Sequence, residues 1–459
     1  MEKKEISLIL DSQKKFFTSG ITADPSFRLE NLKKLRNLIL EYEKEIADAL
    51  WTDFHKPEFE SITTETRFVL AELNHIISRL KKWARPKKVR TPLVHFLSKS
   101  FIRPQPYGQV LIMSPWNFPF QLAFVPLVGA IAAGNCVVLK VSRQVPAVAA
   151  VMHKILSNFS QQHIAMIDGD HSISDYLLDY KFDYIFFTGS TLVGKQVMQK
   201  AAVNLTPLSL ELGGKNPCVV AADAKLGFAA KRIAWGKFIN GGQTCVSPDY
   251  VLVDKKVKDE FLGLIAAEIR NFYGQEAEKS NDFARVISSE SALRMTSFMS
   301  CGKVVTGGNT DPSSRFVSPT VLKDVLPTDL VMKDEIFGPV LPVVDFSDFE
   351  EVYQIIEQHP KPLAAYIFTR SSGLVKEFMQ RTNSGGASVN DTVVQIASPF
   401  LPFGGLGSSG IGRYHGRKSF ETFSNMRSVL VKSNLLDIWL RYPPYTRFKQ
   451  RIVSWIMNL

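Results

Sequence analysis

The sequence has little cysteine and no long hydrophobic run. Four cysteines occur among 459 residues, too few for a disulfide-stabilised scaffold, so we expect a reducing compartment, the cytoplasm. No stretch of 18 or more apolar residues occurs, which argues against a membrane-spanning helix. The first ten residues carry four charges and no long apolar core, so we predict no secretory signal.

Motifs for metal ions and for one class of nucleotide site are also missing. The eight histidines form neither H-x-H nor H-E-x-x-H, and no C-x-x-C occurs, so the sequence predicts no metal site. There is no P-loop. One G-x-G-x-x-G spans residues 405–410, but no strand pattern precedes it, and we interpret it as a glycine-rich loop.

The composition is that of a folded protein with excess positive charge. Hydrophobic residues make up 45% and charged residues 22%, and the formal net charge is +11. The length suggests about three domains or subdomains. The charge favours an anionic partner, which can be a nucleotide, a membrane surface or a nucleic acid. No nucleic-acid recognition motif is present, so we predict no nucleic-acid partner.

The pattern of apolar residues changes along the chain. Residues 1–84 have apolar positions at helical spacing. Residues 85–107 contain four prolines and a basic cluster, which predicts extended strands with turns. From residue 108, short apolar runs alternate with helix-length segments, as in β-α units around a buried parallel sheet. A glycine-rich break after Glu211 predicts a hinge between two α/β domains.

Three residues are candidates for chemistry. Cys245 follows Gly-Gly-Gln-Thr and provides a potential thiolate nucleophile. Asn117, in Ser-Pro-Trp-Asn-Phe-Pro, has an amide able to donate to an oxyanion. Glu211 has apolar neighbours, and burial would suit it to general-base catalysis. Each also has a structural alternative: a buried small side chain, a turn asparagine and a paired carboxylate.

A nucleotide site is suggested by a strand that leads through a turn into a helix. The segment Tyr184–Thr188 is apolar and is followed by Gly189-Ser190-Thr191 and then by Gly194. Backbone N–H groups at such a helix start can bind a pyrophosphate. An ordinary strand–turn–helix is the alternative.

Together these segments resemble the NAD(P)-dependent aldehyde dehydrogenase superfamily. Glu335-Ile-Phe337-Gly-Pro and Pro402-Phe403-Gly-Gly extend the likeness, in order and spacing, over residues 105 to 425. The segments 412–423 and 441–445 resemble the class 3, or fatty-aldehyde, branch in particular.

The resemblance implies an α/β architecture with three parts. These are a Rossmann-like cofactor domain, a catalytic α/β domain and a small β bridging or oligomerisation element. The expected boundaries are 1–84 and 106–211 for the cofactor domain, 212–396 for the catalytic domain, 85–105 and 425–445 for the bridging element, and 446–459 for a C-terminal tail.

The resemblance also implies a reaction and a cofactor, NAD or NADP. Cys245 attacks the aldehyde carbon, Asn117 and the Cys245 backbone N–H hold the oxyanion, and Glu211 activates the water that hydrolyses the thioester. The substrate would be a medium- or long-chain aliphatic or an aromatic aldehyde. The residues implied for cofactor binding are Lys140, Arg143, Gly189, Ser190, Thr191, Gly194, Glu335 and Phe337.

One cofactor position departs from the family pattern. The family often has Lys-Pro-Ser-Glu after this strand, whereas this chain has Lys140-Val-Ser-Arg143. The usual glutamate repels a 2′-phosphate, and an arginine removes that repulsion and can add attraction. The sequence therefore predicts ready use of NADP, unless Arg143 only points into solvent.

The resemblance leaves assembly and two other functions to be tested. Class 3 members are typically dimers, so we expect a homodimer. The aromatic and basic tail is compatible with peripheral contact with an anionic membrane, a cap on the substrate entrance, or packing on the partner subunit. A CoA-acylating dehydrogenase is one alternative, although Glu211 argues against it, and a non-catalytic binding protein of the same fold is another.

Overall fold

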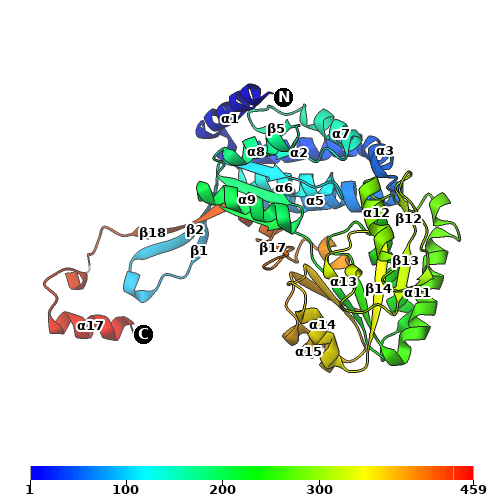
Figure 1. The fold of residues 1–459 in the computed structure, drawn as a ribbon. Helices are drawn as coiled ribbons and strands as arrows, with labels where there is room; N and C mark the ends of the chain where they lie inside the picture. Colours follow the sequence, from blue (N-terminus) through cyan, green and yellow to red (C-terminus); the bar gives the residue numbers. More distant parts are fainter. Residues whose placement is uncertain (1, 438, 458–459) are drawn as a thin grey trace.

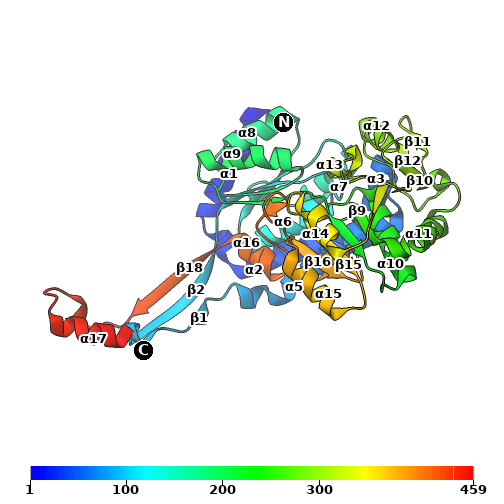
Figure 2. The same cartoon turned by 60° about the horizontal axis from the view of Figure 1, so that its bottom comes forward.

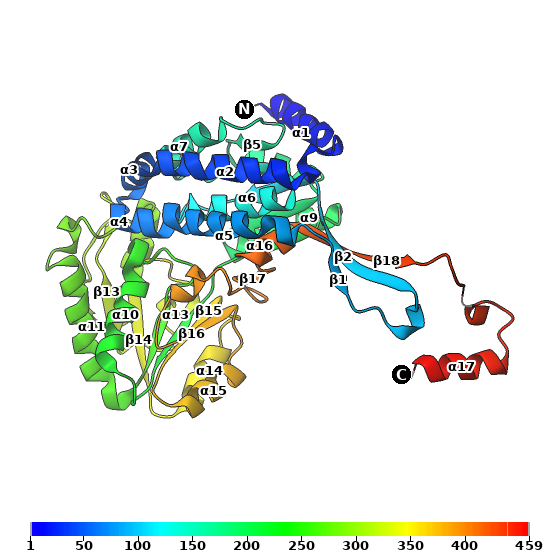
Figure 3. The ribbon, with the colours of Figure 1, turned by 180° about the vertical axis from the view of Figure 1, so that it is seen from behind.

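The computed structural model describes residues 2–437 and 439–457. The chain begins with helices whose apolar stripes pack on the first α/β domain (Figure 1). Figure 3 shows α2 and α5 side by side across this domain, where both contact α6. The bounds of the helices that precede the first strand are α1 (Lys3–Thr18), α2 (Pro25–Glu41), α3 (Glu43–Phe54), α4 (Glu58–Ser61), the π-helix η2 (Ile62–Thr66) and α5 (Arg67–Trp83).

The first domain contains a six-stranded sheet of order β17-β7-β6-β3-β4-β5. Its central strands are continuous apolar runs because helices cover both faces. The strands are β3 (Gln109–Met113), β4 (Cys136–Lys140), β5 (Ile164–Ile167), β6 (Tyr184–Thr188), β7 (Leu208–Glu211) and β17 (Gly410–Ile411). The helices between them are α6 (Gln121–Ala133), α7 (Pro146–Leu156), α8 (His171–Asp179) and α9 (Thr191–Val203).

Strand β17 comes from the glycine-rich segment, far along the chain from its neighbour. It pairs antiparallel with β7, with Gly410 opposite Glu211, whereas the other strand pairs of this sheet are parallel. The loop interpretation holds for residues 405–409, and only the last residue of the segment, Gly410, belongs to a short edge strand. Two residues are too few for a recognisable period.

The second domain contains a seven-stranded sheet of order β10-β13-β14-β9-β8-β15-β16. Its strands are β8 (Pro217–Val220), β9 (Tyr250–Asp254), β10 (Lys303–Thr306), β13 (Thr320–Lys323), β14 (Val340–Phe346), β15 (Ala364–Phe368) and β16 (Gly386–Val389), with a separate pair β11 (Thr310–Asp311) and β12 (Phe316–Val317). The helices are α10 (Leu226–Phe238), α11 (Lys258–Tyr273), α12 (Ser289–Phe298), α13 (Leu330–Lys333), α14 (Phe349–Glu357) and α15 (Ser372–Arg381).

A three-stranded antiparallel sheet extends away from both domains (Figures 1 and 2). It consists of β1 (Lys87–Val89), β2 (Ser98–Pro106) and β18 (Ser424–Lys432), and α16 (Arg417–Thr422) leads into β18. The helix α17 (Arg447–Met457) lies at the far end of this sheet. In the described part of the chain, no helix is both long enough and apolar enough to cross a membrane.

Candidate active site

Two cavities meet at the side chain of Cys245. The first, here the apolar cavity, has a volume of about 250 Å³. Its lining includes Thr63, Phe68, Phe118, Trp235, Val394 and Ile396. The second, here the polar cavity, measures about 270 Å³ and is lined by Asn117, Gly189, Ser190, Glu211, Glu335 and Phe337, among others. Because Cys245 lines both, its sulfur can react with a molecule that extends from one cavity into the other.

A rigid loop holds Cys245 at this junction. Asn240, Gly241 and Gly242 adopt left-handed backbone conformations before it. A Cβ on Gly242 would lie 2.3 Å from the Gly338 carbonyl oxygen, so this close approach requires glycine. The Cys245 carbonyl accepts a hydrogen bond of 2.7 Å from the Asn216 side chain. These constraints fix the position of the Cys245 backbone at the junction.

The surroundings of Cys245 disfavour its thiolate when the site contains protein alone. Burial raises the pKa of the thiol to about 12, and the carboxylates of Glu335 and Glu211 act in the same direction. Cys245 is therefore protonated at neutral pH in this state, and it needs a base or a bound positive charge to become a nucleophile.

Glu211 is a buried carboxyl group with no partner. It ends strand β7, and neither carboxylate oxygen has a hydrogen-bond partner among the described residues. Burial raises its pKa well above the ordinary glutamate value, and the Arg413 guanidinium opposes this only in part. An unpaired buried carboxyl costs free energy, so it indicates a reactive group rather than a structural ion pair.

Asn117 lines the polar cavity and is hydrogen-bonded to the loop that carries Cys245. Its side-chain nitrogen donates to the Gln243 carbonyl oxygen at 3.0 Å, which orients the amide. An amide nitrogen has two hydrogens, so the second remains to bind an oxygen in the polar cavity. Asn117 is buried, which strengthens such a bond.

A third cavity, of about 600 Å³, lies beyond the ends of β4 and β5. It is lined by Ser142, Arg143, His153 and Asp168, among others. Like the polar cavity, it lies at the carboxyl edge of the six-stranded sheet, where α/β folds bind dinucleotides.

The polar cavity has a lining that suits one end of a dinucleotide. A Cβ on Gly189 would lie 2.5 Å from the Phe187 ring, so the close packing of the turn before α9 requires glycine. Ser190 caps that helix, and Gly189 and Ser190 line the polar cavity, so the start of α9 borders the cavity where a pyrophosphate can bind. The residues present therefore fit NAD or NADP.

Comparison with known proteins decides the family. The model of the aldehyde dehydrogenase family matches residues 1–429 of the chain. This chain belongs to the aldehyde dehydrogenase family.

Named relatives of this dehydrogenase are similar over nearly their whole length. The 4,4′-diaponeurosporen-aldehyde dehydrogenase of Staphylococcus aureus is 42% identical over 435 residues, which cover 94% of this chain and 95% of the relative. The dimeric NADP-preferring aldehyde dehydrogenase of the dog, Canis lupus familiaris, is 43% identical over 444 residues, covering 96% and 98%.

A solved structure is also close to this fold. The substrate-bound state of Staphylococcus aureus AldH has a TM-score of 0.96 and is 41% identical, and the match covers 98% of this chain and 99% of that one. The aldehyde dehydrogenase fold is therefore confirmed. So is the predicted activity, the oxidation of aldehydes to carboxylic acids with NAD or NADP.

In this dehydrogenase most of the predicted site residues lie together. Cys245, Glu211, Asn117, Gly189, Ser190, Glu335 and Phe337 line the polar cavity, and Arg143 lines the third cavity. Lys140, Thr191 and Gly194 line neither of these two. Lys140 donates to the Val141 carbonyl oxygen, the Thr191 hydroxyl donates to the Ser408 carbonyl oxygen, and Gly194 packs against Leu212.

Several residues that shape the apolar cavity were not predicted. Thr63, Thr64 and Phe68 enter it from η2 and α5, and His415 enters it from the segment before α16. Burial lowers the pKa of His415 to about 4, so this histidine is neutral at physiological pH. A helical period locates the first three on helices, but it does not reveal which cavity they face.

Proposed function

We propose that Cys245, Glu211 and Asn117 carry out aldehyde oxidation in this chain. The supporting observation is one thiol at the junction of an apolar and a polar cavity, with an unpaired carboxyl group and an oriented amide in the polar one. No other cysteine lines either cavity. The aldehyde would enter through the apolar cavity and the nicotinamide end of the cofactor through the polar one.

The residues suggest an order of events. With the positive charge of an oxidised cofactor bound beside it, Cys245 would release its thiol proton to solvent. Its sulfur then bonds to the aldehyde carbon, and the Asn117 amide and Cys245 backbone N–H donate to the oxygen that becomes negative. A bound NAD or NADP supplies the acceptor for the hydride that leaves this carbon. The product on Cys245 is a thioester. Glu211 then takes a proton from water, whose oxygen attacks the thioester and releases the acid and the thiol.

Glu335, Phe337 and the start of α9 would hold the cofactor. Glu335 and Phe337 both border the polar cavity, and the Phe337 ring lies edge-on to Trp116 with 5.4 Å between ring centroids. That contact fixes one wall on which a flat nicotinamide ring can lie.

The lining of the apolar cavity supports an apolar substrate. Phe68, Phe118 and Trp235 present rings to it, and Val394 and Ile396 add aliphatic surface. Burial of each CH₂ contributes about 0.8 kcal/mol. We therefore propose medium- or long-chain aliphatic or aromatic aldehydes as substrates.

The direct experiment measures NAD(P)H formation at 340 nm and identifies the product. Hexanal, decanal, hexadecanal and benzaldehyde are each supplied with NAD and with NADP, without CoA. We expect free carboxylic acid, because Glu211 provides a base for hydrolysis. A requirement for CoA and release of an acyl-CoA would contradict the role of Glu211. No turnover under either condition would instead support a non-catalytic protein.

We also propose that Arg143 promotes use of NADP. Arg143 is exposed at the third cavity, so its guanidinium can pair with a 2′-phosphate there. The Arg143→Glu variant should lose about tenfold or more in kcat/KM for NADP, because repulsion replaces attraction. The value for NAD should change little. Lys231→Glu, an exposed charge reversal on α10, serves as control. Strict NAD preference in the wild type, unchanged in Arg143→Glu, would contradict this role.

The projecting sheet supports a homodimer. β18 is an edge strand of nine residues whose outer side is unpaired within the described chain, and Leu430 and Val431 are about half exposed on it. Such an edge can add to a sheet of a second copy. Sedimentation equilibrium should give twice the mass of one chain, and a single-chain mass would contradict the dimer.

We propose peripheral membrane contact for α17. Phe448, Trp455 and Met457 are exposed on this short helix, which also carries Arg447 and Arg451, as in helices that lie on anionic membranes. Flotation with anionic and neutral vesicles tests this. Binding to anionic vesicles alone, lost when residues 447–457 are removed, would support it. No binding by the intact chain would point to the partner subunit or the substrate entrance instead.

The four unpaired cysteines support a reducing compartment.

A further inference from the structure

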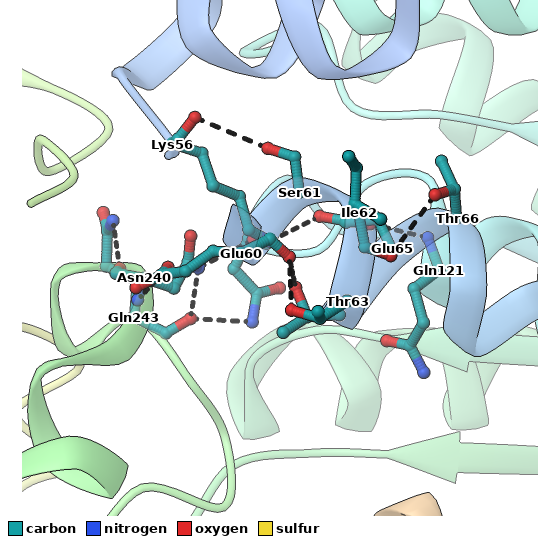
Figure 4. A network of polar contacts seen from close by, with 12 residues as sticks. Lys56, Glu60, Ser61, Ile62, Thr63, Glu65, Thr66, Gln121, Asn240 and Gln243 are labelled. Carbon is teal, nitrogen blue, oxygen red and sulfur yellow. Dashed lines mark hydrogen bonds and ion pairs between the residues drawn. The ribbon is translucent and has the colours of Figure 1, made fainter. Parts of the chain in front are cut away.

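A fully buried ion pair lies beside the active site, outside the catalytic residues. The Lys56 Nζ is 2.7 Å from Glu65 Oε1, and both side chains are 0% exposed. Figure 4 shows the two residues within a network of polar contacts. The cost of removing both charges from water largely cancels the attraction of such a pair, so stability alone explains it poorly. Its contacts indicate another role.

Both members of the pair contact the segment that carries Asn117. The second Glu65 oxygen accepts a hydrogen bond of 2.8 Å from the Gln121 backbone N–H. The Lys56 ammonium lies 3.9 Å from the centre of the Phe118 ring, within the range of a cation–π contact. The pair therefore fixes residues 118–121, which follow the predicted oxyanion donor directly.

The π-helix η2 contributes residues both to the apolar cavity and to the buried ion pair. Thr63 and Thr64 line the apolar cavity, whereas Glu65 is fully buried against Lys56. Single π-helical turns are rare and occur frequently at functional sites.

Glu60 provides a second connection, to the loop that carries Cys245. Its carboxylate accepts a hydrogen bond of 2.9 Å from the Asn240 backbone N–H. The Asn240 side chain donates to the Asn117 carbonyl oxygen at 2.8 Å and to the Gln243 carbonyl oxygen at 3.2 Å. The Gln243 carbonyl also accepts from the Asn117 side chain. Residues 56–65 thus contact both the segment that carries Asn117 and the loop that carries Cys245 (Figure 4).

We propose that Lys56, Glu60 and Glu65 are positioning residues, which keep the Asn117 amide aligned with Cys245 as the oxyanion forms. The inference rests on the roles proposed above for Asn117 and Cys245. None of the three residues needs to touch the substrate. Their effect passes through the Gln121 and Asn240 N–H groups, and a small displacement of an oxyanion donor is costly because the bond strengthens only in the transition state.

The first test removes the Glu60 connection and then restores it. Glu60→Ala should lower kcat by about 10- to 100-fold, in line with the loss of one oriented oxyanion donor, with little change in KM for aldehyde. Glu60→Gln should restore most of kcat, because its amide oxygen can accept the same N–H. Glu58→Ala changes an exposed glutamate on the same helix and should match the wild type.

A second readout separates positioning from damage to the fold. Alkylation of Cys245 by iodoacetamide needs no oxyanion donor, so its rate, followed by mass spectrometry of the peptide that contains Cys245, should be unchanged in Glu60→Ala. A fall in alkylation parallel to the fall in kcat would mean a general loss of the site and would overturn the proposal. A wild-type kcat in Glu60→Ala would overturn the role of Glu60.

The ion pair is tested with both charges removed together. Lys56→Met combined with Glu65→Leu leaves neither charge of the pair buried alone, so the protein should fold, with some loss of stability because the Gln121 N–H loses its acceptor. We expect kcat to fall by about tenfold or more while a cooperative thermal transition and the alkylation rate are retained. A wild-type kcat in this double variant would overturn the role of the pair. Activity in Cys245→Ala, by contrast, would contradict the role proposed for Cys245 itself, on which this inference rests.

Discussion

Replacing Cys245 by alanine is expected to abolish aldehyde oxidation, with kcat falling by more than about 10⁴-fold. Without the sulfur no covalent adduct forms, and no other cysteine lines either cavity. The measurement is NAD(P)H formation at 340 nm with the best aldehyde. Cofactor binding, followed by fluorescence, should persist, because the third cavity and the start of α9 are unchanged.

Cys301→Ala is the matched control. Cys301 is likewise partly buried and unpaired in the second domain, but it lines neither cavity. Its loss should leave kcat within about twofold, as for substitutions away from the reacting atoms. Substantial activity in Cys245→Ala, or equal losses in both variants, would contradict the role of Cys245.

The pH dependence of Cys245 alkylation follows from its pKa. Because burial and two nearby carboxylates raise that pKa to about 12, the cofactor-free thiol is almost entirely protonated at pH 7. The rate of reaction with iodoacetamide should therefore rise about tenfold per pH unit between pH 6 and pH 9 without a plateau. A plateau below pH 8 would show that the thiolate is stabilised in the protein alone.

The central chemistry could be predicted from the sequence because short local segments carry it. Asn117 and Glu211 each follow or end a strand of the first sheet, and parallel strands bring their carboxyl ends to one edge. Cys245 lies in a glycine-containing loop whose left-handed residues fix the position of its backbone. The motifs therefore sufficed to predict that Asn117, Glu211 and Cys245 lie together.

The apolar cavity and the positioning network could not be predicted in this way. Phe68 faces the cavity, while Lys56 and Glu65 pair in the interior, and the contacts that decide this join residues more than 50 apart in sequence. A π-helical turn also shifts the helical period at this point. Lys56 lies in the connection between α3 and α4, and Glu65 lies in η2. Charged residues at such positions normally face solvent, so nothing local marked this pair as buried.

Glu211→Gln is expected to separate the two halves of the reaction. Thioester formation does not need this base, so one equivalent of NAD(P)H per Cys245 should appear in a rapid burst. Steady-state turnover should then fall by about 10²- to 10⁴-fold, because water lacks a proton acceptor. Mass spectrometry should detect the acyl group on Cys245. Full turnover in the variant, or the absence of both burst and turnover, would contradict a role confined to hydrolysis.

The same substitution should increase stability at neutral pH. The pKa of Glu211 is raised well above its unfolded value, so the folded state binds this proton more tightly. The folded protein is therefore favoured at low pH and loses stability as pH rises above about 4.3, where the unfolded carboxyl ionises. Glutamine does not ionise, so Glu211→Gln should melt at a higher temperature than the wild type at pH 8 and nearly equally at pH 4.5. Glu260→Gln, an exposed change on α11, should leave the melting temperature unchanged at both pH values.

A Glu211→Gln variant that turns over slowly and is more stable is the combination expected when an unpaired buried carboxyl group is needed for catalysis although it lowers the stability of the folded protein.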